Sequence, residues 1–123
     1  QHIGWDNTGF MTIDLLRSLL QKHPNLYMAL RAEERMDQVG GGGPMPNRIA
    51  DENWKLRDAW IELFKEFPDR FMIGGDEFVP GKSARAPKFP QSFEETWALL
   101  NQLPETLARK IGRDNAARIY RLE

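Results

Sequence analysis

Two side chains in this sequence, Asp76 and His2, could together support metal-assisted proton transfer. Asp76 follows the apolar run 71–73 and two glycines. A carboxylate in that position can bind a divalent ion or accept a proton from water. His2 precedes Gly4 and can bind a metal ion through a neutral imidazole nitrogen. We therefore take both as candidate metal ligands, and Asp76 also as the candidate catalytic group.

Each candidate has a structural alternative. A carboxylate after two glycines can cap a turn, and a histidine near a chain end can be an ordinary surface residue. Three further side chains are weaker candidates for substrate binding. Arg31 could hold a substrate carboxylate with two parallel hydrogen bonds, although a solvated loop arginine is the more common outcome. Trp5 and Glu77 have the same ambiguous status.

The residues between these candidates predict amphipathic helices. Apolar residues recur at helical spacing over 12–22 and over 51–66. Thr12 and Asp51 are the expected N-caps of these two helices, because their side-chain oxygens can accept from the free N–H groups of a first turn. Further helices are expected to begin near Ser92, Pro104 and Arg113.

Short apolar runs at 26–30 and 70–74 are typical of buried strands. Because helices separate them, these strands are expected to be parallel and joined by right-handed crossovers. Gly- and Pro-rich stretches predict flexible loops at about 31–50 and 77–90. Residues that follow parallel strands meet at one edge of the sheet, so we expect His2 to end a strand whose body lies before residue 1.

Composition narrows the class of protein. The chain has 123 residues, of which 41% are apolar and 28% charged, and a net charge of -1, which is typical of one water-soluble globular domain. The balanced charge argues against a nucleic-acid partner, and no apolar stretch is long enough to cross a membrane. Cysteine is absent, which excludes disulfides, thiolate zinc sites and cysteine nucleophiles. A cytoplasmic location is the working expectation.

Several stretches resemble the amidohydrolase superfamily, specifically its amidohydrolase-related metal-dependent hydrolases. They are His2-Ile3-Gly4, His23 to Tyr27, Phe67 to Asp76, and Asn115 to Tyr120. The resemblance covers nearly the whole chain. It implies an α/β fold in which residues 1–123 form one partial domain, the C-terminal portion of a (β/α)8 TIM barrel. That portion would hold the last two strands with their helices, plus the C-terminal helices.

In this resemblance His2 follows the sixth barrel strand, residues 26–30 form the seventh, and Asp76 follows the eighth. It implies a hydrolase that attacks a small carboxylated, amide or lactone substrate with metal-activated water. The divalent metal is expected to be zinc, with manganese or iron as alternatives. A nonoxidative decarboxylase on the same fold and a noncatalytic α/β interaction domain remain alternatives.

The sequence departs from the family pattern in two places. Gly75 stands where serine is frequent, and Ala29-Leu30-Arg31 replaces an acidic-Leu-Ser ending of the seventh strand. The first change is mild, whereas the second leaves the substrate pocket unassigned.

The candidate metal site is incomplete within these residues. A zinc site needs about three protein ligands and a water position, and His2 with Asp76 supplies two ligands at most. The resemblance places the other ligands before residue 1, so the segment alone is expected to be inactive. Unpaired strand edges would favour pairing with the missing N-terminal part of the barrel, or association into a homo-oligomer.

Overall fold

The computed structural model describes residues 2–3, 9–31, 47–74 and 93–122. Within these ranges it has a small parallel sheet of three strands, β1 (His2–Ile3), β2 (Met28–Leu30) and β3 (Phe71–Ile73). The strands lie in chain order, with β2 hydrogen-bonded to both neighbours. The two predicted strands are therefore present in shorter form and are parallel, as expected. The strand at His2 is also confirmed.

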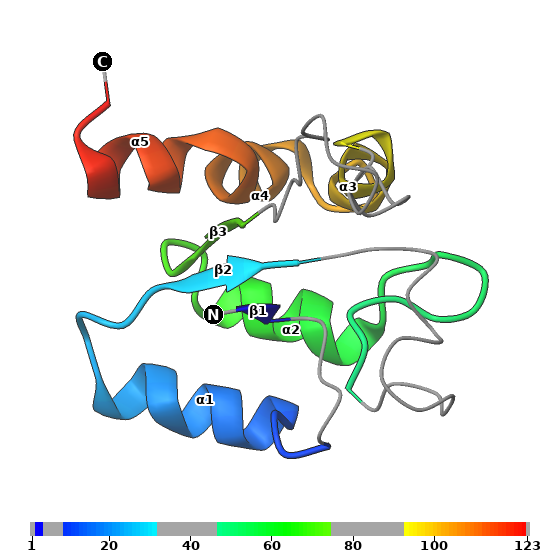
Figure 1. Ribbon diagram of the computed structural model, residues 1–123, viewed down its shortest axis with the longest axis horizontal. Helices are drawn as coiled ribbons and strands as arrows, with labels where there is room; N and C mark the ends of the chain where they lie inside the picture. The colour runs from blue at the N-terminus through cyan, green and yellow to red at the C-terminus, as the bar shows by residue number, and fades with distance from the viewer. Residues whose placement is uncertain (1, 4–8, 32–46, 75–92, 123) are drawn as a thin grey trace, which may run out of the picture.

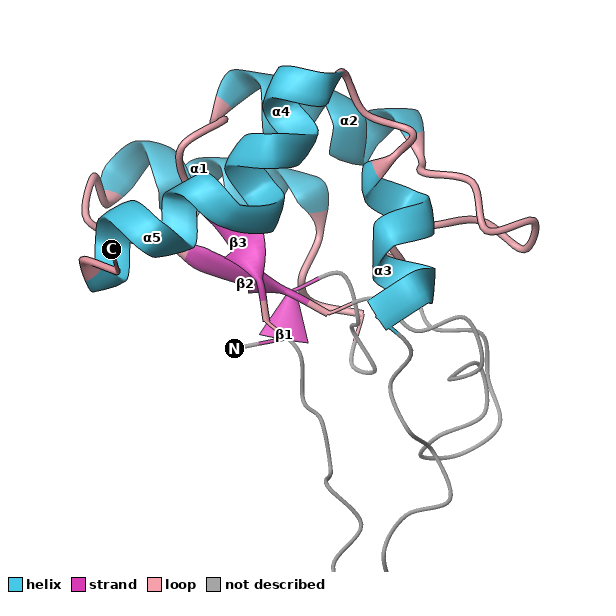
Figure 2. Ribbon diagram, turned by 90° about the horizontal axis from the view of Figure 1, so that it is seen from above, coloured by secondary structure: helices cyan, strands magenta, loops and turns pink. Residues whose placement is uncertain are grey.

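Helices connect the strands and run back against their direction (Figure 1). Helix α1 (Ile13–Lys22) joins β1 to β2, and α2 (Asp58–Glu66) joins β2 to β3. Figure 2 shows α1, α2 and α4 on the same side of the strands. None of the described helices is long and apolar enough to cross a bilayer. The helices after β3 are α3 (Phe93–Leu100), α4 (Glu105–Arg109), the π-helix η1 (Lys110–Asp114) and α5 (Asn115–Tyr120).

The core lies between the sheet and these helices. Met28, Leu30 and Phe71 face it from β2 and β3, because side chains two residues apart share one face of a strand. Phe64 of α2 meets the ring of Phe71 edge-on, with 4.9 Å between ring centroids. Other fully buried members of this core are Leu16, Leu20, Trp60, Leu63 and Ile111.

Helix α1 forms as its sequence predicts. The Thr12 hydroxyl accepts a hydrogen bond from the Leu15 amide at 3.2 Å, which confirms the expected N-cap. Leu16 and Leu20, on the predicted apolar stripe, are buried.

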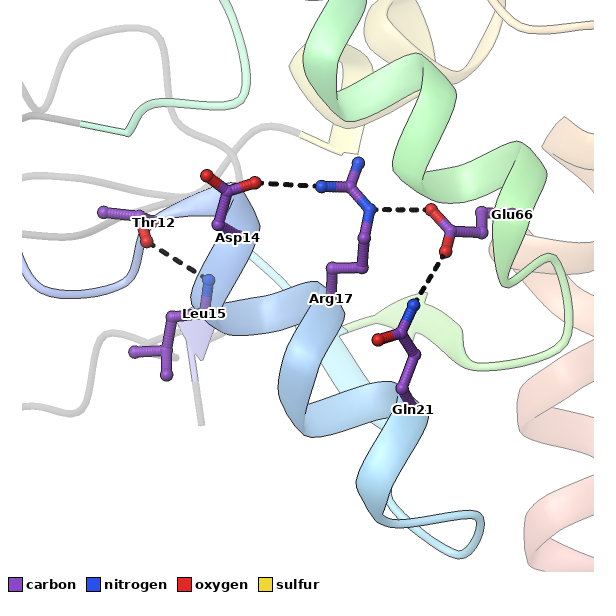
Figure 3. Close-up of polar contacts among 6 residues, drawn as sticks. All are labelled: Thr12, Asp14, Leu15, Arg17, Gln21 and Glu66. Carbon is purple, nitrogen blue, oxygen red and sulfur yellow. Dashed lines mark hydrogen bonds and ion pairs between the residues drawn. The ribbon is translucent and has the colours of Figure 1, made fainter.

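A surface network joins α1 to α2 (Figure 3). Arg17 donates to Glu66 at 2.8 Å and to Asp14 at 3.0 Å, and Gln21 donates to the other oxygen of Glu66 at 3.4 Å. The hydrogen bond to Glu66 is the main reason why the pKa of Arg17 lies above its ordinary value. Because the charges are solvated, the network orients the two helices and adds little stability.

The second predicted helix starts later than expected. The sequence suggested Asp51 as its N-cap, but α2 begins only at Asp58. The Asp51 carboxylate instead accepts from the amides of Asn53 and Lys55, both at 2.9 Å, and closes a local turn. These bonds, first that from Lys55, hold the pKa of Asp51 below its ordinary value. The prediction was wrong because this local turn competes with helix formation.

The segment before α2 is fixed to α3 by two side chains. The indole N–H of Trp54 donates to the Glu95 carbonyl at 3.1 Å. Gln102 accepts from the Leu56 amide at 2.9 Å and donates to the carbonyls of Trp54, at 2.9 Å, and Ala98, at 3.2 Å. These bonds hold Trp54 at a φ of 57°, a left-handed conformation that costs a bulky residue about 1–2 kcal/mol.

The helices α4, η1 and α5 follow one another without a break, whereas the sequence predicted two separate short helices. A helix begins after Pro104 as expected, but Arg113 lies inside η1, which joins α4 directly to α5. Asn115 is 1% exposed, and its amide donates to the carbonyls of Pro68, at 2.9 Å, and Phe71, at 2.8 Å. These two hydrogen bonds from Asn115 connect α5 to β3 and to the turn before it. The expected capping residue Ser92 lies outside the described residues.

Candidate functional site

The three strands end at a common edge of the sheet, and the sequence predicts the candidate metal and catalytic residues at this edge. Ile3, Leu30 and Ile73 share one register row, so all three strands end together. His2 lies one row earlier, beside Ala29, which in turn pairs with Met72. The segments that leave this edge carry the candidate residues.

Gly74 sits directly after β3 at this edge. Its amide donates to the Leu30 carbonyl at 2.9 Å, which continues the pairing between β3 and β2 by one bond. A Cβ atom at Gly74 would lie 2.5 Å from the Cβ of Ala29, far inside contact distance. Glycine therefore permits a close approach at this position, and the neighbour is Ala29 of β2.

Three candidate residues, Asp76, Trp5 and Glu77, lie outside the described residues. In the sequence Asp76 follows Gly74 by two positions. The structure thus brings the backbone of His2 and the residue that leads toward Asp76 to one edge of the sheet.

Arg31 is the first residue after β2 and is only 7% exposed. The alternative of a solvated loop arginine was therefore wrong. Arg31 directly follows β2, whose residues Met28 and Leu30 are also buried. A guanidinium withdrawn from water interacts more strongly with a carboxylate than an exposed one does, which suits it to anion recognition.

An apolar pocket lies behind the same edge. Its lining touches β2 and β3 and, as far as the described residues go, contains no charged side chain, so these residues offer dispersion contacts and no acid–base group. Sequence analysis missed the part that Ile49 plays in it, because Ile49 stands at the end of a Gly- and Pro-rich stretch that predicted a loop. The pocket is lined by Leu30, Ile49, Leu56, Phe64, Ile73, Thr96, Leu99, Leu100 and Leu103.

Metal binding can be judged from the types of donor present. Across the described ranges, no group of three His, Asp or Glu side chains is placed to hold a metal ion. An imidazole and a carboxylate, as in His2 and Asp76, are donors that zinc and manganese accept. The donor types of His2 and Asp76 fit a divalent ion. Two ligands are fewer than the three or so protein ligands that a zinc site needs.

Comparison with known families decides the assignment of the chain. The family model described as Amidohydrolase matches residues 2–122. The chain belongs to the amidohydrolase family. Searches of curated proteins and of solved structures gave no match.

The family match extends over every candidate residue of this amidohydrolase chain, from His2 to Glu77. It confirms the resemblance first suggested by the motifs around His2, Tyr27 and Asp76.

Proposed function

We propose that this amidohydrolase chain forms the closing part of a (β/α)8 barrel. Two features support the proposal: the parallel strands lie in chain order, and the connecting helices α1 and α2 lie on one side of them (Figure 2). Successive right-handed crossovers in one direction build a barrel, whereas a doubly wound sheet reverses direction at a switch point. The remaining strands would then pair with the outer edges of β1 and β3.

The function we propose is metal-dependent hydrolysis of a small carboxylated, amide or lactone substrate. The observation that carries this proposal is the family match over residues 2–122. Its site would be the carboxyl edge of the sheet, where barrel enzymes hold their reacting groups. His2 lies in β1 one residue before its end, and the sequence reaches Asp76 two residues after Gly74.

His2 and Asp76 would hold the metal, together with ligands from other parts of the barrel. A bound zinc, manganese or iron ion would make water more acidic and polarise the substrate carbonyl. We assign the proton transfer to Asp76, whose carboxylate would accept a proton from the attacking water and then donate it to the leaving group. Such a group works best when held beside the reacting atoms.

Arg31 would orient the substrate. Its guanidinium, buried next to the end of β2, would hold a substrate carboxylate through two parallel hydrogen bonds. Trp5 and Glu77 would add further contacts to the substrate. This arrangement predicts that substrates with a carboxylate are preferred over their uncharged analogues.

Metal removal tests the proposal. Dialysis of the intact protein against a chelator should lower hydrolysis of a panel of lactones, amides and carboxylated esters at least about tenfold, because the ion both activates water and polarises the carbonyl. Returning zinc, manganese or iron should restore the rate. Activity that persists after metal analysis shows complete removal would contradict the proposal.

The same assay separates hydrolysis from decarboxylation. A hydrolase releases acid or amine without carbon dioxide, whereas a decarboxylase releases carbon dioxide from carboxylated members of the panel. Carbon dioxide release without hydrolysis would replace our proposal with the decarboxylase alternative.

A further inference from the structure

A group of cations surrounds Tyr27 at the amino ends of the strands, opposite the candidate site. Tyr27 precedes β2, Arg70 precedes β3, and Arg118 lies in α5. The guanidinium carbon of Arg70 is 5.3 Å from the centre of the Tyr27 ring, and that of Arg118 is 5.7 Å from it. Both distances are within cation–π range, so one exposed ring contacts two guanidinium groups.

Positive charge exceeds negative charge in this cluster. Lys110 pairs with the Asp69 carboxylate at 2.7 Å, and Arg118 donates to the Asp69 carbonyl at 2.8 Å. Among the described residues, no carboxylate lies within ion-pair distance of Arg70 or Arg118. Counted over the described residues, the cluster therefore has three cations and one carboxylate, which is an excess of two positive charges.

Each guanidinium is held by backbone carbonyls and keeps donors to spare. Arg70 donates to the carbonyl of Leu26 through Nε at 2.6 Å and to that of His23 through Nη2, which leaves Nη1. Arg118 engages Nη2, which leaves Nε and Nη1. Tyr27 is 37% exposed, and its hydroxyl bonds to no residue in the described part of the chain. Tyr27 and Arg118 are exposed and Arg70 is half-buried, so the cluster lies at the surface.

We propose that Tyr27, Arg70 and Arg118 form a binding site for a phosphate group at the amino ends of the strands. A phosphate monoester carries about -1.5 to -2 charges at neutral pH, which matches the excess of two positive charges among the described residues of the cluster. It also presents three terminal oxygens to the two guanidinium groups and the tyrosine hydroxyl. A carboxylate would bring one charge and two oxygens, and would leave part of the site unsatisfied.

Inorganic phosphate is the probe that tests this site. In the intact protein at constant ionic strength, a phosphate titration should produce saturable shifts of the Arg70 and Arg118 Nε–H signals in nitrogen-15 NMR spectra. Arg118→Gln should weaken phosphate binding at least about tenfold, because a charge-assisted hydrogen bond is lost. Tyr27→Phe removes only the hydroxyl, keeps both ring contacts, and should weaken binding about three- to tenfold.

Arg113→Gln is the matched control. Arg113 is an exposed arginine of η1, and its loss changes the net charge by the same amount while leaving the cluster intact. Binding in this variant should equal that of the unaltered protein. Equal weakening by Arg113→Gln and Arg118→Gln, or shifts that do not saturate, would overturn the proposal. Acetate binding as tightly as phosphate would overturn the assignment to a phosphate group.

Discussion

Replacing Asp76 by asparagine should lower the turnover number of the intact enzyme by about two to four orders of magnitude. The amide has nearly the shape of the carboxylate, but it cannot accept a proton from water or carry the negative charge that a metal ligand supplies. The thermal unfolding temperature should change little, because the substitution preserves volume and hydrogen-bonding capacity. Steady-state kinetics, metal analysis and calorimetry on the same preparation measure the three quantities.

Asp58→Asn is the control for this substitution. Asp58 is an exposed acid in the first turn of α2, a helix packed behind the sheet. The exchange makes the same chemical change away from the proposed site, so turnover should stay within about twofold, as an exposed surface exchange has little effect on structure. Full activity in Asp76→Asn, with normal metal content, would remove Asp76 from the mechanism.

Gly74→Ala should destabilise the protein by about 1–3 kcal/mol, the usual cost of forcing an extra methyl group into a packed region. The new Cβ would lie 2.5 Å from the Cβ of Ala29 and 3.4 Å from its Cα, so β2 and β3 must move apart. Urea denaturation measures the loss. Turnover should fall as well, because the segment that carries Asp76 starts at this position.

A second substitution tests whether this contact is the cause. Ala29→Gly removes the atom that the new methyl group would meet, so the double variant Ala29→Gly with Gly74→Ala should recover at least half of the lost stability. Gly112→Ala serves as a control, because its nearest neighbour is the flexible tip of Leu100 at 3.1 Å, and it should be tolerated better. Strictly additive losses at positions 29 and 74 would show that the contact is not the cause.

Much of the fold could be predicted because the apolar residues that recur at helical or strand spacing in the sequence are the ones that pack in the core. In α1, the apolar stripe of Leu16 and Leu20 and the hydroxyl of Thr12 indicate the same helix, and the structure contains it. Parallel pairing followed from the helices between the strands. That pairing in turn brings His2 and Gly74 to a common edge, which the sequence pattern anticipated.

Other features depend on contacts between distant residues. The start of α2 at Asp58 follows from side-chain bonds of Asp51 to nearby amides, which compete with a helical first turn. The left-handed conformation of Trp54 is held by Gln102 of the segment after α3, and no local preference of tryptophan predicts it. The burial of Arg31 likewise reflects its tertiary surroundings.

The cluster around Tyr27 was also invisible in the sequence. Arg70 and Arg118 are far apart along the chain, and no local pattern around either residue indicates that they share a neighbour. Only the docking of α5 against the start of β3, partly through Asn115, brings both guanidinium groups to one ring.

The shared metal site of His2 and Asp76 is tested most directly by a crystal structure of the zinc-loaded intact protein, with diffraction recorded on both sides of the zinc absorption edge. We predict an anomalous peak about 2.0–2.2 Å from an imidazole nitrogen of His2 and from a carboxylate oxygen of Asp76. A zinc peak bound by other residues, with these two side chains pointing to different regions of the molecule, would contradict the account.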